Sequence, residues 1–507
     1  MSRIAGTIRL MRMARLLLAQ DSVLPPNFHT RAPLSLRAAR RLFTLGVTRY
    51  DNNERGEALS ERIAKLGPSY IKLGQFLATR PDIIGGNLAA DLRLLQDKMA
   101  PFDSALAAKL LQDEVLNAND IISELGEPIA AASIAQVHRA KDARNPQRNL
   151  AVKFLRPNIE DKLRAELDVF FGVAKLIEWL MPSARRLRPT DSLYILQRTI
   201  SLETDLRLEA AALSEMYENT KNDPFFTVPQ VIWEATSKQV LTMEWVDGTA
   251  ASKVDELAEA GHDMPALANR LIQSFLTHAL RDGFFHADLH QGNLMISKDG
   301  TLVGIDFGIV GRLSFDSRRF LAEILHGFIT RDYHKVARVH FEAGYVPKHN
   351  SVDEFSQALR SIGEPIRDQN ADNISMANLL SHLFDVTEQF EMETQPQLLL
   401  LQKTMVTIEG VARSFDPKLN IWDAAQPIVS DWLKKALGPE GKLREARASF
   451  QGAGRVLKGL PNTLDALHLA AMKLSEPEPQ RPDWVARIIG ALALAAGLSA
   501  IFLIWQN

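Results

Sequence analysis

The segment 286–308, HADLHQGNLMISKDGTLVGIDFG, contains side chains whose types and spacing suit the transfer of a phosphoryl group. Asp288 could accept or orient the proton of a nucleophile. Asn293 follows five residues later and Asp306 opens the sequence DFG, and both could hold the magnesium ions that bridge the phosphates of ATP. A lone D-x-x-x-x-N would carry little weight, because turn residues can produce it. Together the three residues predict a catalytic centre with Asp288 as catalytic residue and Asn293 and Asp306 as metal ligands.

The order of these residues matches the protein-kinase signature, with two departures. Ala287 stands where most protein kinases carry arginine, and the H-x-D form is also typical of small-molecule kinases that resemble aminoglycoside phosphotransferases. No A-P-E sequence follows Gly308, and the chain returns to a helical pattern within a few residues. The sequence therefore leaves no room for a long activation segment that could dock a peptide.

Two short strands are expected to hold the metal-binding residues together. Apolar runs at 293–296 and 302–305 flank Asp299-Gly300, a dipeptide typical of a tight hairpin turn. Such a hairpin would place Asn293 and Asp306 at the same end.

A second group of residues is expected to bind the nucleotide. Strand-like runs at 134–139 and 150–154 flank a polar turn, and Lys153 occupies the place of the kinase lysine that pairs with the α and β phosphates. Alanines stand where kinases carry a glycine-rich loop. Because alanine disfavours positive φ, this loop must approach phosphate differently. The expected nucleotide contacts are Ala130, Ala131, Ala132, Ser133, Ile134, Ala135, Gln136, Val137 and His138.

A kinase also needs a helix glutamate that forms an ion pair with the nucleotide-binding lysine. Glu209 lies in a helical pattern over 158–220 and is the candidate partner of Lys153. The two residues are 56 positions apart, so the sequence predicts a helical insertion between them.

Two strands are expected at 228–234 and 239–245. The second strand and the residues after it, LTMEWVDG, resemble a kinase hinge. In that hinge, backbone groups of Glu244 and Val246 would contact adenine.

The sequence LGPSYIKLGQFLATRP predicts a helix that starts at Gly67-Pro68 and ends before Pro81. Lys72 and Gln75 share one face of this helix. Gly74 lies between them and costs about 1 kcal/mol of helix stability, which suggests close approach of another group. Spacing alone favours a solvated lysine and glutamine.

Both ends of the chain carry features that relate to membranes. Residues 1–45 are rich in arginine, and 8–18 alternate arginine with apolar residues at helical spacing. This pattern fits either a helix on anionic lipid or an amphipathic helix packed on the domain. Residues 488–505 contain no charge over 18 positions and would span roughly 27 Å as a helix, which predicts a transmembrane segment. Basic residues precede it and none follows, which predicts that the bulk of the chain is cytoplasmic.

The composition is that of an ordinary globular protein. The 507 residues include 46% apolar and 24% charged residues, and the net charge of −2 gives no argument for nucleic-acid binding. The chain has no cysteine, which excludes disulfides and thiolate metal sites.

The motifs together resemble the UbiB/ADCK family of atypical kinases. They are KLGQ (Lys72, Gly74, Gln75), AAASIAQVH (130–138), AVK (Lys153), ETD (Glu203, Asp205), Glu209, HADLHQGN and DFG. The resemblance implies an α+β, protein-kinase-like fold of two lobes with a helical N-terminal extension that covers the active site. It also implies a regulatory role for the KLGQ residues and for Glu203 and Asp205, which would occupy the space where a protein substrate would dock.

The expected segments follow from these motifs. They are a basic N-terminal segment (1–56), the KLGQ extension (57–126), an N-lobe with a helical insertion (127–247), a mostly helical C-lobe (248–474), a linker (475–484) and a transmembrane helix (485–505).

The resemblance further implies a role in ubiquinone biosynthesis at the bacterial inner membrane, with ATP and Mg²⁺ as cofactors. The implied partners are anionic membrane lipid, polyprenyl-phenol quinone precursors and the enzymes of ubiquinone biosynthesis. ATP hydrolysis is favoured over protein phosphorylation. Two alternatives stay open: a small-molecule phosphotransferase of the aminoglycoside-kinase type, and a nucleotide-switched scaffold or lipid chaperone without turnover.

Overall fold

A computed structural model describes residues 55–78, 86–92, 99–180, 188–368 and 396–438, with isolated positions before residue 46, at 84 and 95, and between 386 and 392. The chain divides into two units, Met1–Trp432 and Leu433–Asn507. The elements described below belong to the first unit, and the last helix runs a few residues beyond it.

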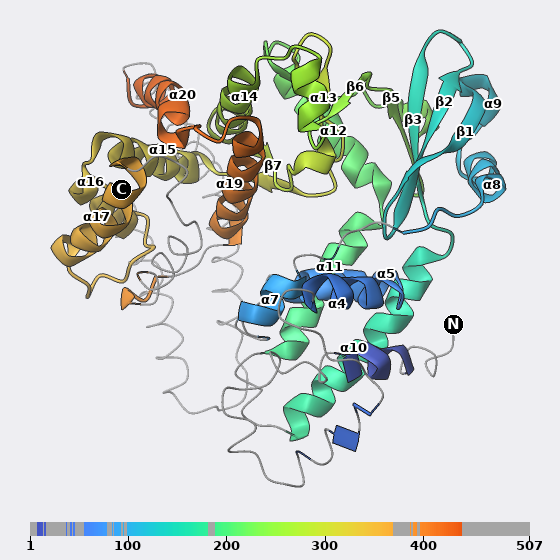
Figure 1. Cartoon of the computed structure of the whole chain (residues 1–507), viewed down its shortest axis with the longest axis horizontal. Coiled ribbons are helices and arrows are strands. Elements are labelled where there is room, and N and C mark those ends of the chain that lie inside the picture. The colour runs from blue at the N-terminus through green and yellow to red at the C-terminus, as the bar shows by residue number, and fades with distance from the viewer. Residues whose placement is uncertain are drawn as a thin grey trace, which may run out of the picture. The chain divides into compact units, whose positions relative to one another are not determined.

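An antiparallel sheet of order β1-β2-β3-β5 forms the first part of the kinase-like region (Figure 1). Its strands are β1 (Ile122–Ala131), β2 (Ala135–Asp142), β3 (Asn149–Leu155) and β5 (Val240–Glu244). Helices α8 (Ser104–Glu114) and α9 (Ala118–Ile121) share an apolar core with one face of the sheet, which includes Val152 and Phe154. Because side chains alternate along a strand, Lys153 points to the other face.

The insertion predicted between Lys153 and Glu209 consists of α10 (Ile159–Leu180) and α11 (Pro189–Glu203), followed by α12 (Leu206–Thr220). The N-terminal helices α4 (Arg55–Ala64), α5 (Pro68–Ala78) and α7 (Gly86–Leu92) pack on one another. Helix α5 contacts the insertion, where the rings of Tyr70 and Phe170 meet edge to face with centroids 5.4 Å apart. The extension is therefore anchored on the inserted helices.

The second part of the kinase-like region carries the predicted hairpin. Strands β8 (Leu294–Ser297) and β9 (Leu302–Gly304) pair antiparallel within a sheet of order β4-β9-β8-β6. Gly300 has a φ of +80° in the turn, a backbone conformation that glycine adopts at no steric cost. The other strands are β4 (Phe226–Thr227) and β6 (Gly248–Ala250), and a separate pair joins β7 (Phe284–His286) to β10 (Val310–Arg312). The hairpin prediction is confirmed.

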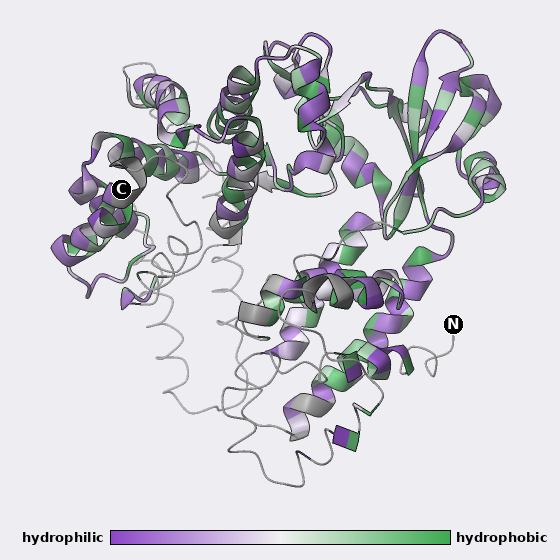
Figure 2. Cartoon of the chain, viewed as in Figure 1, coloured by the Kyte–Doolittle hydropathy of each residue, from purple (hydrophilic) through white to green (hydrophobic). Residues whose placement is uncertain are grey.

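Helices make up most of the rest of this region. They are α13 (Val254–Glu259), α14 (Met264–Thr277), α15 (Phe315–Thr330), α16 (Tyr333–Glu342), α17 (Val352–Asp368), α19 (Pro396–Phe415) and α20 (Ile421–Leu437). Helices α14 and α19 pack against each other. Both helices carry hydrophobic and hydrophilic residues along their length (Figure 2). This packing brings α19 next to the chain that leads into the predicted catalytic loop.

Two expectations about strands need correction. Segment 228–234 is not a regular strand, because Pro229 has no N–H to donate and the chain turns into a 3₁₀ helix at Trp233–Ala235. Its only bridge is between Val231 and Met243. Strand β1, upstream of residue 134, was not predicted. Its burial does not alternate and its register shifts, so no strand periodicity shows in the sequence.

The predicted linker and transmembrane helix lie outside the described residues. Within the part of the chain that is described, every helix is too short or too polar to cross a bilayer.

Candidate phosphoryl-transfer site

Lys153 lies between two carboxylates at the centre of the site. Its Nζ is 2.7 and 2.9 Å from the two carboxylate oxygens of Glu209 on α12, and 2.8 Å from Oδ2 of Asp306. The ion pair predicted between Lys153 and Glu209 is therefore formed. The structure also brings the aspartate of the DFG sequence to the same lysine, so residues from β3, α12 and the loop after β9 converge here.

The two carboxylates of this cluster differ in how deeply they are buried. The Glu209 side chain is 7% exposed and the Asp306 side chain is 41% exposed. Burial raises the pKa of Glu209 to about 7, although Lys153 opposes the shift. Burial also acts on the other two groups, but the contact between them prevails, so the pKa of Lys153 is raised and that of Asp306 is lowered. Lys153 and Asp306 are thus a charged pair, and Glu209 is the group that takes up a proton most readily.

The predicted catalytic loop is ordered by His286 and Asn293. The backbone N–H of Asp288 donates to Nδ1 of His286 at 3.0 Å, and burial lowers the pKa of His286 to about 4, so this ring is neutral near pH 7. The amide of Asn293 donates to the backbone oxygen of Asp288 at 3.0 Å, which leaves its Oδ1 for another partner. The N–H of Ile305 donates to the backbone oxygen of Asn293 at 3.1 Å, so the hairpin sets Asn293 beside Asp306.

These two side chains fit the expected metal. An amide oxygen and a carboxylate are hard oxygen ligands, and Mg²⁺ in kinase sites is usually held by one or two protein groups together with phosphates and water. No cluster of three or more His, Asp or Glu side chains able to hold a metal occurs among the described residues. Asn293 and Asp306 are the residues that would hold Mg²⁺ when a nucleotide is bound.

Helix α19 contributes residues to this site that the sequence did not indicate. Lys403 Nζ lies 3.2 Å from Oδ1 of Asp288. The hydroxyl of the buried Thr404 lies 2.9 Å from the backbone oxygen of Ala287 and 2.7 Å from that of Leu400. From the sequence, this segment was assigned only to a mostly helical C-lobe. A lysine in an apolar helix gives no signal of such a contact, because its partner is 115 positions away.

The alanine-rich loop joins β1 to β2. Ala130 and Ala131 end β1, and Ala135 begins β2. Arg156 holds the loop: its Nε and Nη2 donate to the backbone oxygen of Ala132 at 3.1 and 2.9 Å, and its N–H donates to the oxygen of Ile134 at 2.8 Å. Ser133 is buried, and its hydroxyl has no hydrogen-bond partner among the residues that the structure describes. The loop therefore keeps a free hydroxyl among backbone groups fixed by an arginine.

Residues 136–138 divide between the two faces of the sheet. Val137 is the cross-strand neighbour of Lys153 and shares its face. Gln136 and His138 point to the opposite face, where Gln136 bonds both backbone groups of Phe102 and contacts Nε2 of His138 at 2.7 Å. Their side chains were expected at the nucleotide, but strand alternation turns them away from it, so they brace β2 from behind.

The predicted hinge follows β5. The N–H of Glu244 donates to the oxygen of Gln230 at 2.9 Å, and its carboxylate accepts from Arg148 at 2.6 Å. The N–H of Glu244 is therefore already used. Among the described residues, neither backbone group of Val246 takes a hydrogen bond, so both remain available to a nucleotide base.

The KLGQ residues lie on α5, against the inserted helices. Lys72 Nζ is 2.9 Å from Glu203 at the end of α11, and both side chains are largely buried. Gly74 has the predicted close neighbour, because a Cβ there would clash with Leu95. Gln75 is half-buried on the same helix. The ion pair between Lys72 and Glu203 joins the N-terminal extension to the chain that enters α12.

Asp205 has a different role from Glu203. It caps α12 by accepting from the N–H of Arg207 at 3.2 Å, and its carboxylate pairs with the same arginine. Asp205 therefore fixes the start of the helix that carries Glu209.

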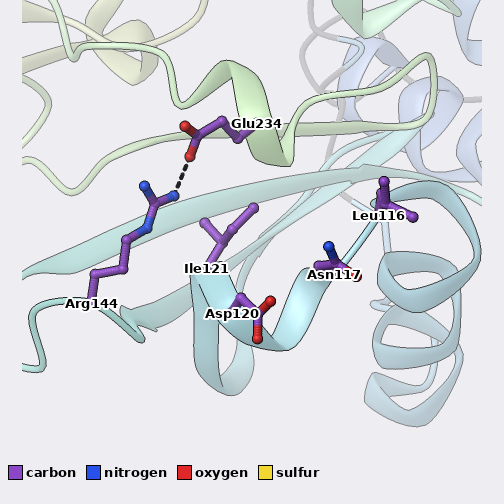
Figure 3. A pocket seen from close by; sticks show the side chains of 6 residues that line it. All are labelled: Leu116, Asn117, Asp120, Ile121, Arg144 and Glu234. Atoms are coloured by element: carbon purple, nitrogen blue, oxygen red, sulfur yellow. Dashed lines mark hydrogen bonds and ion pairs between the residues drawn. The ribbon is translucent and has the colours of Figure 1, made fainter.

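A shallow hollow lies away from these residues, on the outer side of the sheet. It is lined by Leu116, Asn117, Asp120, Ile121, Arg144 and Glu234. Figure 3 shows the ion pair between Arg144 and Glu234 at its edge. None of the expected site residues lines it.

The sheet with its lysine, the helix with its glutamate, and the loops with Asp288 and Asp306 define a protein-kinase-like domain. Comparison with known families agrees: residues 94–340 match the ABC1 atypical kinase-like domain, and residues 359–420 match the UbiB helical domain.

Similar proteins place the chain in a family. A protein of Histophilus somni named "Probable protein kinase UbiB" is 36% identical over 470 residues, which are 90% of this chain and 86% of the relative. A protein of the same name from Pseudomonas paraeruginosa is 36% identical over 449 residues, 87% of this chain and 84% of the relative. The chain belongs to the UbiB family of atypical kinase-like proteins.

A solved structure supports the fold. It is entitled "The complex structure of Rv3197-erythromycin from Mycobacterium tuberculosis", and it matches with a TM-score of 0.51 and 22% identity over 82% of this chain and 99% of the other.

Proposed function

We propose that this protein is an ATP-dependent phosphotransferase or ATPase that uses Mg²⁺. The observation that carries the proposal is the convergence of Glu209 and Asp306 on Lys153, next to a loop that presents Asp288. ATP with Mg²⁺ would supply the phosphoryl group. Lys153 would bind the α and β phosphates, and Asn293 and Asp306 would hold the metal.

Other residues support nucleotide binding and proton transfer. Within the part of the chain that the structure describes, the Val246 backbone groups have no hydrogen-bond partner, which supports a contact with the nucleotide base. The buried Ser133 hydroxyl also has none there. Asp288 would accept the proton of the nucleophile, because its side chain is one-third exposed and its backbone is fixed by His286.

Membership of the family supports a proposal for the substrate and the setting. The relatives carry the name "Probable protein kinase UbiB", and we extend the proposal to ubiquinone biosynthesis, with polyprenyl-phenol intermediates or the biosynthetic enzymes as targets. The uncharged segment 488–505 supports anchoring in the bacterial inner membrane with the kinase-like region in the cytoplasm. The missing A-P-E segment supports ATPase or small-molecule kinase activity over peptide phosphorylation.

The test is phosphate release from ATP by the purified full-length chain with Mg²⁺, with and without anionic vesicles and a phenolic quinone-precursor mimic. Asp306→Asn is the inactive control. Turnover that rises with vesicles and phenol and disappears in the control supports the proposal. A chain that binds ATP, as measured by a thermal shift, but never releases phosphate would instead be a nucleotide-switched scaffold.

A further inference from the structure

Helix α19 packs against the predicted catalytic loop. The hydroxyl of Thr404 is buried and lies within hydrogen-bond distance of two backbone oxygens, that of Ala287 at 2.9 Å and that of Leu400 in its own helix at 2.7 Å. Near the other end of the helix, the amide of Gln291 donates to the hydroxyl of Ser414 at 2.9 Å. These contacts attach α19 to the loop on both sides of Asp288, so the position of the helix is coupled to the position of the loop.

Lys403, which precedes Thr404 in the sequence, forms an ion pair with Asp288. Lys403 Nζ lies 3.2 Å from Oδ1 of Asp288, and the two side chains are 51% and 33% exposed. The other oxygen, Oδ2, lies 4.0 Å from His290 Nε2 and has no closer protein partner within the described residues. One oxygen of the carboxylate is thus held by a cation and the other is open.

An ion pair of this exposure contributes little to the stability of a protein. The backbone of the loop is already fixed by Thr404, His286 and Asn293. What these contacts leave undetermined is the rotation of the Asp288 side chain. Among the described residues, Lys403 is the closest side-chain partner of either carboxylate oxygen, at 3.2 Å from Oδ1, so it is the group best placed to fix this rotation.

We propose that Lys403 is a positioning residue for phosphoryl transfer, acting through Asp288, an inference that rests on the proposed function above. The ammonium holds Oδ1, and Oδ2 faces the nucleophile and takes its proton. The helical segment of the family thereby completes the catalytic loop of the kinase-like domain. Its role is separate from ATP binding, which Lys153 and the alanine-rich loop perform.

The test compares Lys403→Met and Lys403→Arg with Asp288→Asn, alone and combined, in the full-length chain. Lys418→Met, which removes an exposed lysine beyond the end of α19, is the matched control. The measurements are ATP hydrolysis with Mg²⁺ and the rise in melting temperature that Mg²⁺ and ATP produce. We expect Lys403→Met to lower kcat about tenfold or more, since misplaced catalytic groups cost on this scale. KM for ATP and the ATP-induced thermal shift should stay at wild-type values.

Two further results distinguish positioning from a structural role. Lys403→Arg should recover part of the lost kcat, because it restores the cation. In the Asp288→Asn background, Lys403→Met should cause no additional loss, since the lysine acts through the missing carboxylate.

Several outcomes would overturn the inference. One is a kcat in Lys403→Met that equals that of Lys418→Met. A kcat above that of Lys418→Met would also overturn it, and would indicate that the contact of Lys403 with Asp288 is inhibitory. Another is loss of the ATP-induced thermal shift, which would place Lys403 in nucleotide binding. A wild-type chain without Mg²⁺-dependent turnover would overturn the proposed function and the role of Lys403 together. An active wild type with an active Lys403→Met would overturn only the latter.

Discussion

The lysine at the centre of the site faces two carboxylates, so the cluster would carry one net negative charge if all three groups were ionised. Burial assigns this imbalance to Glu209, whose side chain is less exposed than that of Asp306. A Glu209 carboxyl that is partly protonated near pH 7 reduces the competition for the Lys153 ammonium. In the proposed mechanism, Lys153 would then be better able to bind phosphate, and Asp306 would stay ionised to hold a metal.

This charge assignment predicts a pH dependence for Glu209→Gln. The folded-state pKa of Glu209 is raised from 4.5 to about 7, so its contribution to stability is complete below pH 4.5 and is lost as the pH rises through about 7. Glutamine has no such dependence. We expect the variant to gain stability relative to the wild type between pH 5 and 8, by up to about 3 kcal/mol at about 1.36 kcal/mol per pKa unit. Chemical denaturation of the nucleotide-free proteins at several pH values measures it.

The other members of the cluster do not disturb this measurement. The lowered pKa of Asp306 affects stability only in acid, and the raised pKa of Lys153 only in strong base. His286 titrates in both proteins and cancels in the difference. A stability difference that stays constant from pH 5 to 8 would mean that Glu209 is ionised throughout, and the charge assignment would be wrong.

Among the elements, the alanine-rich loop depends on Arg156. This side chain donates to the backbone oxygens of Ala132 and Ala100. These two hydrogen bonds hold a loop that lacks the glycines of ordinary kinases. Arg156→Met should raise the Kd for ATP about tenfold, since hydrogen bonds to charged groups contribute roughly 1.5–3 kcal/mol each and the loop loses its support. Calorimetric titration with ATP and Mg²⁺ measures the affinity.

The matched control for Arg156 is Arg198→Met, on an exposed position of α11. It should leave the Kd unchanged. Equal affinities for all three proteins would show that the loop is held in place without Arg156.

Helix α5 offers a test of why the KLGQ sequence contains glycine. A Cβ at Gly74 would clash with Cδ1 of Leu95, so Gly74→Ala should lower the melting temperature. In a Leu95→Ala background the same change should raise it, because alanine is favoured over glycine in a helix by about 1 kcal/mol. Gly172→Ala in α10 has open space around it and should be stabilising in either background. A Gly74→Ala chain as stable as Gly172→Ala would refute the close-packing explanation.

For the whole molecule, the success of sequence reasoning depended on whether a residue belonged to a compound motif. Lys153, Glu209 and Asp306 were placed together because kinase chemistry requires all three. Lys403 was missed, since nothing local marks a lysine whose partner is remote in the sequence.

The same limit applies to orientation. A run of nine residues was assigned to the nucleotide loop, but only the register of β2 reveals that Gln136 and His138 face away from Lys153. Strand β1 was not recognised because its register shifts remove the alternation on which strand prediction depends.

Membrane attachment is the remaining prediction at this scale. Leu494 and Leu498 lie near the middle of the uncharged segment 488–505. Replacing both with arginine would cost roughly 6 kcal/mol of insertion free energy, at about 2.5–3.5 kcal/mol for each arginine at the centre of a span. The full-length variant should leave the membrane fraction in an alkaline carbonate wash, whereas the wild type stays.

The paired control replaces the same leucines with isoleucine, which keeps the segment apolar and should preserve attachment. In detergent, both variants should bind ATP as the wild type does, because every residue of the candidate site lies within Met1–Trp432. If the arginine variant remained in the washed membranes, the C-terminal segment would not be the anchor. The basic residues at the N-terminus would then be the next segment to test. Arg9 in that segment pairs with Glu166 of α10, so binding to the membrane would have to compete with this contact.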